Sequence, residues 1–212
     1  LKQAQELGYA EADPTNDVEG IDAAYKLAIL ASLAFRTQVR PADVYHEGIS
    51  RLAARDFRYA RELGYTIKLL AIAKEKNGSV EARVHPVLVP QDSLLAQVSG
   101  AFNAVQVEGD LVGEVIFYGQ GAGAQPTTSA ILADVLAIAR KLSGGSPVLP
   151  SPRFNKNTAI IPMAQVHTRA YFRMNVADHP GVLAQIAQVL GEHHISISSV
   201  IQKGRRVKGA VP

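Results

Sequence analysis

The residues best suited to chemistry lie near the start of the chain, where acidic side chains and one lysine precede an apolar run. Asp22 and Lys26 are four residues apart, so a helix places them on one face with the acidic residue first, the better order for an ion pair. Between residues 27 and 35 only Ser32 is polar, and a helix that is apolar on all sides is expected to be buried. Lys26 is therefore expected to be partly removed from water, as suits a lysine that transfers protons.

The start of this helix is predicted from its capping residues. Asn16 is a good N-cap and Glu19 follows three residues later, so the helix is expected to begin near Asp17. Gly20 then falls inside the helix, where glycine costs roughly 1 kcal/mol relative to alanine, which suggests that something lies close to the backbone there. The alternative is a capped helix start with an ordinary surface ion pair and no catalytic role.

The same stretch contains a longer pattern with defined spacing. It comprises Ala4, Gly8, Tyr9, Ala10, Asp13, Pro14, Asp17, Val18, Gly20, Asp22 and Lys26. Every one of these positions resembles the homoserine dehydrogenase signature. The resemblance implies NAD(P)-dependent interconversion of L-homoserine and L-aspartate 4-semialdehyde, a step in threonine, methionine and isoleucine biosynthesis.

The resemblance also implies a role for each site residue. Lys26 is the catalytic acid/base, and Asp22 orients it and helps to bind the hydroxyl end of the substrate. Glu11 binds the substrate ammonium group, and Asp17 is a further substrate-binding carboxylate. Gly8 is a backbone position that contacts the cofactor, for which the sequence does not distinguish NAD from NADP.

A glycine-rich loop, residues 119–129, lies between an expected strand and an expected helix over residues 130–142. Backbone amides in such a loop can approach an anionic or planar ligand, but the spacing G-x-G-x-G is not a dinucleotide fingerprint. The pattern alone is equally that of a tight turn before a threonine-capped helix. The family resemblance favours a cofactor contact here, and Gly121 is the residue expected to make it.

Composition is that of a folded protein. The 212 residues, 47% of them hydrophobic, suffice for one large domain or a domain and a half. A net charge of +3 from dispersed residues, with 6% aromatics, gives no reason to expect nucleic-acid binding. The absence of cysteine excludes disulfides and thiolate chemistry, and no apolar run approaches the ~20 residues that span a bilayer, so the cytoplasm is the expected compartment.

The chain begins with Leu1 and enters directly into an amphipathic stretch, residues 1–7, which suggests a start inside a larger protein. The nucleotide-binding half that the family resemblance implies is expected upstream, and the chain alone is expected to lack dehydrogenase activity. His46 and His85 have no metal-ligand partner at suitable spacing, so no metal site is expected.

An α+β fold is predicted, with a mixed sheet covered by helices. A helix is expected over residues 42–63, ended by Gly64, and a short helix over residues 93–100. Asn77-Gly78 predicts a hairpin between strands over 65–73 and 80–89, with one face buried and one wet. Further strands are expected over 104–107 and 112–118, and all four strands are expected to form one sheet.

The C-terminal part resembles a different family. A strand over residues 167–176, the sequence Asp178-His179-Pro180-Gly181-Val182-Leu183, a helix to His193 or His194 and a strand over 195–201 are similar to the first half of an ACT domain. This resemblance implies a partial ferredoxin-like unit that binds an amino acid, with threonine the expected effector. The expected divisions are a catalytic domain over 1–142, a linker over 143–166 and a partial ACT domain over 167–212. The family forms homodimers through its sheet, and the alternative function is a non-catalytic amino-acid-sensing or oligomerisation module.

Overall fold

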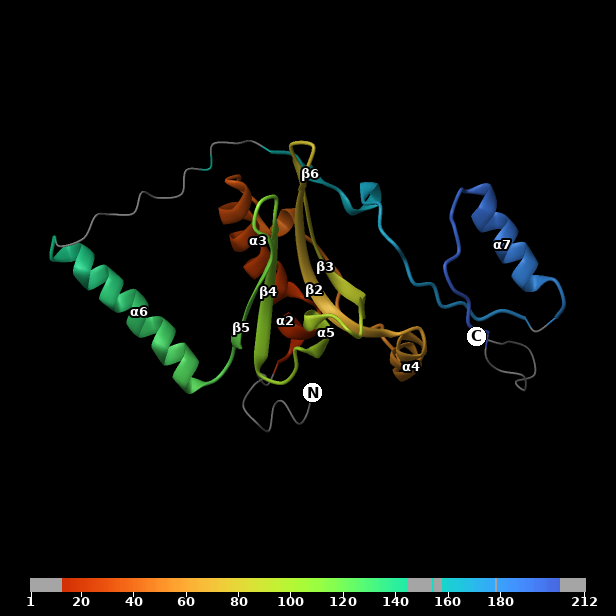
Figure 1. Cartoon of the computed structure of the whole chain (residues 1–212), viewed down its shortest axis with the longest axis horizontal. Coiled ribbons are helices and arrows are strands. Elements are labelled where there is room, and N and C mark those ends of the chain that lie inside the picture. Colours follow the sequence, from red (N-terminus) through yellow and green to blue (C-terminus); the bar gives the residue numbers. More distant parts are fainter. Residues whose placement is uncertain (1–12, 145–153, 155–157, 178, 203–212) are drawn as a thin grey trace.

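The computed structural model describes residues 13–144, 154, 158–177 and 179–202. The first elements are α2 (Thr15–Val18), α3 (Ile21–Phe35), η1 (Pro41–Asp43), β1 (Tyr45–His46), α4 (Ala54–Glu62), β2 (Tyr65–Lys76), β3 (Ser79–Pro90) and α5 (Leu94–Gln97). They are followed by β4 (Phe102–Gly109), β5 (Gly113–Gln120), α6 (Ala124–Leu142), β6 (Ile160–Ile161), η2 (Met163–Gln165) and α7 (Val182–Glu192). The α+β architecture is confirmed (Figure 1).

The central sheet is organised by the hairpin of β2 and β3. Its strands pair antiparallel from Tyr65 with Pro90 to Lys76 with Ser79, and the two residues of the turn, Asn77 and Gly78, have φ angles of 52° and 75°. Positive φ at both positions is what a two-residue hairpin turn requires, and Asn-Gly adopts it at little cost. The predicted hairpin is therefore confirmed.

Strand β3 has neighbours on both edges, which changes its predicted burial. Strands β1 and β6 both pair parallel with its second edge, so that Tyr45 is adjacent to Arg83 and Ile161 to Glu81. Glu81 and Arg83 are only 8% and 5% exposed, and their side chains form an ion pair with each other. The expectation of one wet face is wrong for this strand, because its charged residues are buried and neutralise each other.

Helix α3 covers one face of the sheet. Its residues Ala24, Leu27, Ala28 and Ala31 form a core cluster with the β3 residues Val80, Ala82 and Val84 and with Val39 and Val44. The opposite face of the helix is open, since Ile29, Leu30 and Leu33 are 62%, 46% and 50% exposed. The prediction that this helix is buried on all sides is wrong, because only one layer of the described chain packs against it.

The helix predicted over residues 42–63 forms only in its second half. Arg40 and Asp43 hold the 3-10 turn η1 through a side-chain ion pair of 2.8 Å, and the chain then extends as β1 to pair with β3. Sheet pairing overrides the weak helical pattern of this segment. Helix α4 follows, and Gly64 with a φ of 85° ends it as predicted.

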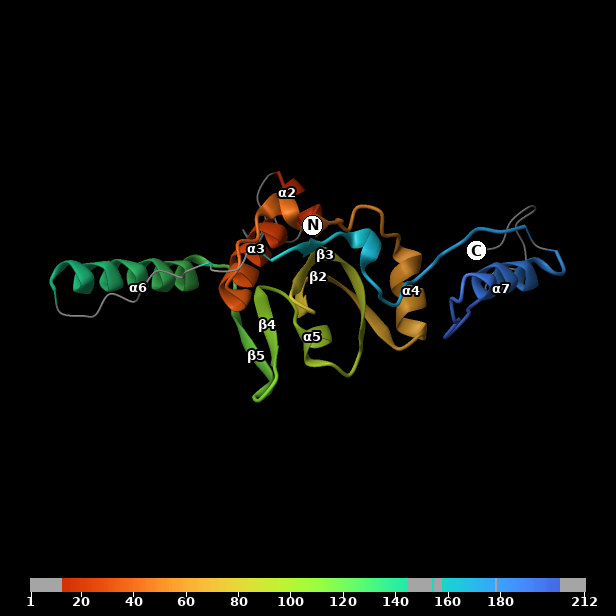
Figure 2. The same cartoon turned by 90° about the horizontal axis from the view of Figure 1, so that it is seen from above.

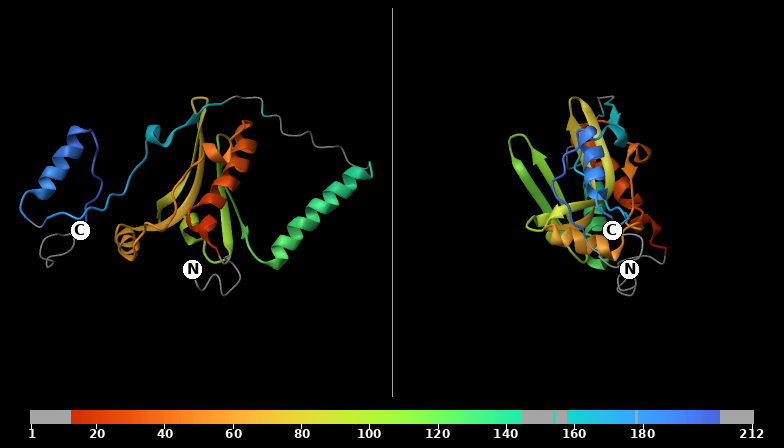
Figure 3. Two further views of the ribbon diagram at one scale, coloured as in Figure 1. Left: turned by 180° about the vertical axis from the view of Figure 1, so that it is seen from behind. Right: turned by 90° about the vertical axis from the view of Figure 1, so that its right-hand side faces the viewer.

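Strands β4 and β5 form a separate two-stranded sheet and do not extend the central one. The rings of Phe102 and Tyr118 stack across this hairpin with their centroids 4.9 Å apart. Figure 3 shows the hairpin splayed away from β2 and β3. The predicted strands are thus present, but the single four-stranded sheet expected from them is divided in two.

The two longest segments outside the sheets are helices without buried residues. Neither α6 nor α7 buries a residue, and Figure 2 shows them on opposite sides of the central unit. The strands expected over 167–176 and 195–201 are absent from the described residues apart from a single bridge position at Val176, and no second described strand lies beside them to extend that pairing. None of the described helices is both long and apolar enough to cross a bilayer.

Candidate active site around Gly20

The predicted catalytic segment folds as two helices with a glycine between them. Gly20 has a φ of 73° and precedes α3, whereas α2 ends at Val18. Asn16 lies inside α2 and does not cap it, so the predicted capping box is wrong. The N-cap position is Pro14, which makes no side-chain cap, and the Asp13 carboxylate before it accepts hydrogen bonds from the backbone N–H of Thr15 at 3.1 Å and from the Thr15 hydroxyl at 2.6 Å. Both hydrogen bonds lower the pKa of the Asp13 carboxyl, and the bond from the Thr15 hydroxyl has the larger effect.

Gly20 allows α3 to approach the sheet closely. A Cβ atom at this position would lie 3.1 Å from Cγ1 of Val84, a residue that is fully buried. The expectation that something lies close to this backbone is confirmed, and the neighbour is the core of the sheet. Left-handed backbone at Gly20 also turns the chain so that Asp22 lies in the first turn of α3, where the helix dipole favours a carboxylate.

Asp22 and Lys26 form the predicted ion pair. Nζ of Lys26 lies 2.6 Å from Oδ2 of Asp22, and the side chains are 71% and 44% exposed. Lys26 is on the open side of α3, while Ala24 and Leu27 point into the core. The expected removal of Lys26 from water is therefore wrong for the described chain, because nothing described covers this side of the helix at the pair.

The other predicted site residues are placed unevenly. Asp17 is exposed on α2, the helix that packs beside α3, so it belongs to the same region as Asp22 and Lys26. Glu11 and Gly8 lie outside the described residues. Gly121 is on the loop between β5 and α6, where its N–H donates to the carbonyl oxygen of Ala101 at 2.9 Å. Because that amide is already used, it is not free to bind a ligand in this conformation.

A second glycine, which the sequence reasoning missed, fixes the back of this turn. A Cβ atom at Gly48 would lie 2.4 Å from the carbonyl oxygen of Val18 and 2.5 Å from Cα of Glu19. The next residue, Ile49, donates its N–H to the same carbonyl oxygen at 2.9 Å. The available signal was a glycine in the middle of a predicted helix, where it costs stability unless close packing requires it.

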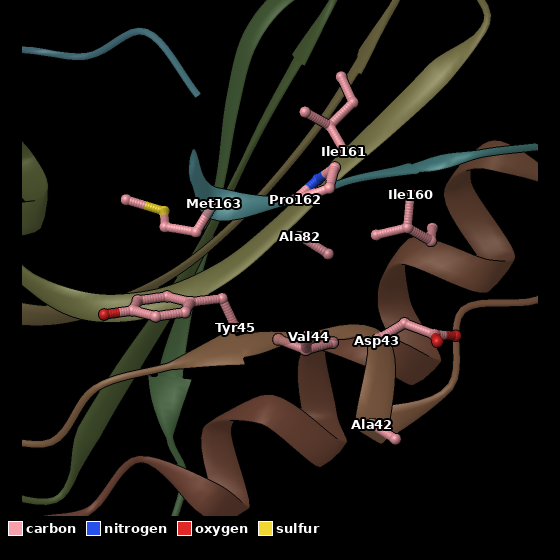
Figure 4. Close-up of a pocket in the computed structure, with 9 residues that line it drawn as sticks. All are labelled: Ala42, Asp43, Val44, Tyr45, Ala82, Ile160, Ile161, Pro162 and Met163. Carbon is pink, nitrogen blue, oxygen red and sulfur yellow. The ribbon is translucent and has the colours of Figure 1, made fainter. Parts of the chain in front are cut away.

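A cavity lies away from these residues, between the ends of β1 and β6. It has a volume of about 360 Å³ and is lined by Ala42, Asp43, Val44, Tyr45, Ala82, Ile160, Ile161, Pro162 and Met163 (Figure 4). Its polar groups already have partners: the hydrogen bond from Arg40 lowers the pKa of Asp43, and Tyr45 donates its hydroxyl to Glu47 at 3.1 Å. The cavity contains none of the predicted site residues.

A metal site is not formed by the residues that the structure describes, among which no group of three or more histidine, cysteine, aspartate or glutamate side chains could hold an ion.

Comparison with known proteins identifies the family. The homoserine dehydrogenase family model matches residues 1–136, which include the whole Gly20 turn and both sheets except β6. The chain belongs to the homoserine dehydrogenase family. An ACT domain model also matches residues 170–211, which confirms the second resemblance.

Individual relatives agree with this assignment. Homoserine dehydrogenase of Neisseria gonorrhoeae is 47% identical over 209 residues, which cover 96% of this chain and 48% of that protein. The Mycobacterium tuberculosis H37Rv enzyme is 50% identical over 211 residues, covering 96% and 47%. The chain thus spans about half the length of the curated relatives it matches.

Solved structures show the same fold. A homoserine dehydrogenase from Thiobacillus denitrificans has a TM-score of 0.85 and 43% identity, covering 100% of this chain and 49% of that one. A hyperthermophilic archaeal homoserine dehydrogenase mutant, in complex with NADPH, has a TM-score of 0.51 and 28% identity over 66% of this chain and 39% of that one.

Proposed function

We propose that this chain supplies the substrate-binding and proton-transfer half of a homoserine dehydrogenase that interconverts L-homoserine and L-aspartate 4-semialdehyde. The observation that carries the proposal is the ion pair between Asp22 and Lys26, which the Gly20 turn sets at the start of α3. Membership of the family supports the reaction type. The geometry supports the choice of residues.

The chemistry needs one proton transfer at the substrate oxygen. Bound NAD(P) supplies the hydride donor in one direction and the hydride acceptor in the other. During reduction the ammonium of Lys26 stabilises the negative charge that develops on the aldehyde oxygen and gives it a proton, and during oxidation the lysine takes that proton back. Asp22, 2.6 Å from the lysine nitrogen, holds the amine in place and helps to bind the hydroxyl end of the substrate.

The remaining carboxylates recognise the amino-acid end of the substrate. Asp17 lies on α2 in the same region as Asp22, and we assign it and Glu11 to binding the substrate, with Glu11 taking the ammonium group. A carboxylate beside an ammonium group forms a charge-assisted hydrogen bond, which positions the substrate as well as binding it.

Cofactor contacts are assigned to Gly8 and Gly121, the latter beside a shallow depression of about 380 Å³ lined by Ala124, Gln125, Thr128, Ser129 and Leu132. The N–H of Gly121 donates to the carbonyl oxygen of Ala101, so this amide does not contact a cofactor in this conformation. The cofactor must therefore be held mainly by residues other than Gly121.

Exposure of the ion pair is a further reason to expect that the chain alone is inactive. Lys26 is 71% exposed, so water competes with any substrate for its protons and screens its charge. A steady-state assay of the 212-residue chain with aspartate semialdehyde and NADPH, followed at the absorbance of NADPH, should show no turnover. Normal turnover would contradict this expectation.

A fusion tests the assignment of Lys26. The chain matches 48% of the Neisseria gonorrhoeae relative, and joined to the remaining part of that relative it should regain turnover. In that fusion Lys26→Ala should reduce kcat at least about 100-fold, the loss typical of removing a general acid/base. Lys76→Ala, a matched exposed lysine at the tip of the β2–β3 hairpin, should leave it unchanged. Equal activity of the Lys26 and Lys76 variants would refute the assignment.

A second function, amino-acid sensing, is favoured by the ACT match over residues 170–211. We propose threonine as the effector. Calorimetric titration of the fusion should give a threonine binding heat that persists in Lys26→Ala. Loss of the heat in that variant would place threonine at the substrate site instead, and absence of any heat would remove threonine as an effector.

We also propose that the assembled protein is a cytoplasmic homodimer. Support comes from apolar side chains that the described chain leaves uncovered on β4, β5 and α6, among them Phe117, Leu132 and Leu136, which are 64%, 54% and 53% exposed. Light scattering of the fusion should give twice the mass of one chain, and a monomer at micromolar concentration would contradict the proposal.

A further inference from the structure

Asp56 connects the C-terminal part of the chain to the catalytic unit. It lies in the first turn of α4 and is only 2% exposed. Its Oδ1 atom accepts a hydrogen bond from the hydroxyl of Tyr171 at 3.2 Å and lies 2.6 Å from Nε of Arg173. The partners come from a segment more than a hundred residues later in the sequence, which Figure 2 shows passing along α4 after η2.

The spacing of the two partners suits an extended segment. Tyr171 and Arg173 are two residues apart, so both side chains leave the same side of an extended chain. The Arg173 side chain is 25% exposed, and its Nε–H is not aimed at the carboxylate, so the contact is an ion pair and not a hydrogen bond. Burial, and then the hydrogen bond to Asp56, raises the pKa of Tyr171 to about 12.

The same carboxylate also fixes the start of α4. Its Oδ2 atom accepts a hydrogen bond from the N–H of Ala53 at 2.8 Å and so satisfies a donor at the helix N-terminus. Any movement of Arg173 and Tyr171 therefore pulls on the side chain that sets where the helix begins.

The segment before Ala53 leads directly to the Gly20 turn. Residues 49–53 join Gly48 to the start of α4. Gly48 packs against the backbone of Val18 and Glu19. The N–H of Ile49 donates to the Val18 carbonyl oxygen at 2.9 Å. Arg173 is thus connected to the turn that precedes Asp22 through Asp56, the start of α4, residues 49–53 and the packing of Gly48 on Val18.

We propose that Asp56 couples residues 167–176 to the Gly20 turn, so that displacement of this segment loosens the start of α4 and then the contact between Ile49 and Val18. The consequence for Asp22 and Lys26 rests on the proposed function. The mechanical coupling does not, and it is measured without substrate or cofactor. Asp56 acts here as a positioning residue.

Amide hydrogen exchange on the 212-residue chain tests the coupling. Arg173→Gln removes the charge that holds the segment, and Arg169→Gln is the matched control, because Arg169 is exposed on the same segment. We expect exchange of the Ala53 and Ile49 amides to rise about three- to thirtyfold in Arg173→Gln, the range typical of coupling through a contact network, and to stay unchanged in Arg169→Gln.

A second variant, Tyr171→Phe, completes the test. Tyr171→Phe removes one hydrogen bond while keeping the ring, so it should raise the exchange of Ala53 and Ile49 by less than Arg173→Gln does, without risk of unfolding the segment. Faster exchange in residues 167–176 with Ala53 and Ile49 unchanged would overturn the proposal, as would an equal rise in the Arg169→Gln control or no rise in either Arg173→Gln or Tyr171→Phe.

Discussion

Gly48→Ala provides the sharpest test of how the Gly20 turn is supported. The new methyl group would lie 2.4 Å from the Val18 carbonyl oxygen and 2.5 Å from Cα of Glu19. Both neighbours are backbone atoms, so neither can rotate away as a side chain would. The loop that carries residue 48 must therefore withdraw from the turn between α2 and α3.

Two contributions set the size of the effect. Forcing an extra carbon into a packed contact costs about 1–3 kcal/mol. Withdrawal of the loop also lengthens the hydrogen bond from Ile49 to Val18, which is 2.9 Å in the native chain and whose net loss costs about 0.5–1.5 kcal/mol. Withdrawal of the loop relieves the steric overlap but weakens the hydrogen bond, so the two costs are alternatives and do not add. We therefore expect a total loss of about 1–3 kcal/mol in the free energy of unfolding.

Urea unfolding followed by circular dichroism measures this loss, and Gly119→Ala is the matched control. Gly119 is on β5, and a Cβ atom there would meet nothing within 4 Å. The control should change the free energy of unfolding by less than about 0.5 kcal/mol. The reasoning fails if Gly48→Ala is as stable as Gly119→Ala and keeps the Ile49 amide protected from exchange, since the loop would then tolerate the methyl group without moving.

Two more predictions concern the core and the segment around Asp56. Ser32→Ala should lower the free energy of unfolding, measured in urea, by about 1–3 kcal/mol. The buried Ser32 hydroxyl accepts a hydrogen bond from the Val39 N–H at 3.0 Å and donates one to the Ala28 carbonyl oxygen at 2.7 Å. The control Ser143→Ala should change the free energy of unfolding little, because Ser143 is exposed and makes a similar bond within its own helix. Tyr171 should ionise near pH 12, so in an alkaline titration read at the tyrosinate absorbance Tyr171→Phe should remove one phenol that titrates near pH 12. The pKa of Tyr171 is raised on folding, so its contribution to stability is complete below pH ~10 and is lost as pH rises toward 12.

Several features of this protein were determined by local sequence. The Asn77-Gly78 hairpin formed as predicted because the turn conformation depends on those two residues and hardly on their surroundings. The ion pair of Asp22 and Lys26 is likewise local, being fixed by a spacing of four on one helix. The signature between Ala4 and Lys26 was sufficient to indicate the family that the comparisons confirmed.

Other features depend on which surfaces meet. The pattern of residues 42–63 contained no information that β3 would have an open edge for β1, and an edge strand is stabilised by its neighbour more than by its own propensity. Residues 160–161 pair with β3 although they lie in the predicted linker, for the same reason. The expected strands over 167–176 and 195–201 show the converse, since no second described strand lies beside them.

Solvent exposure of the Asp22–Lys26 ion pair was also beyond the reach of the sequence. An apolar run after Lys26 predicted burial on every side, but hydrophobic side chains are buried only where another layer covers them, and the described chain covers one face of α3. Spacing along one helix thus placed Asp22 beside Lys26. The packing of Gly20 against Val84, of Gly48 against Val18 and of Asp56 against Arg173 arose only in the tertiary structure, because each joins segments whose separation in sequence leaves no periodic signal.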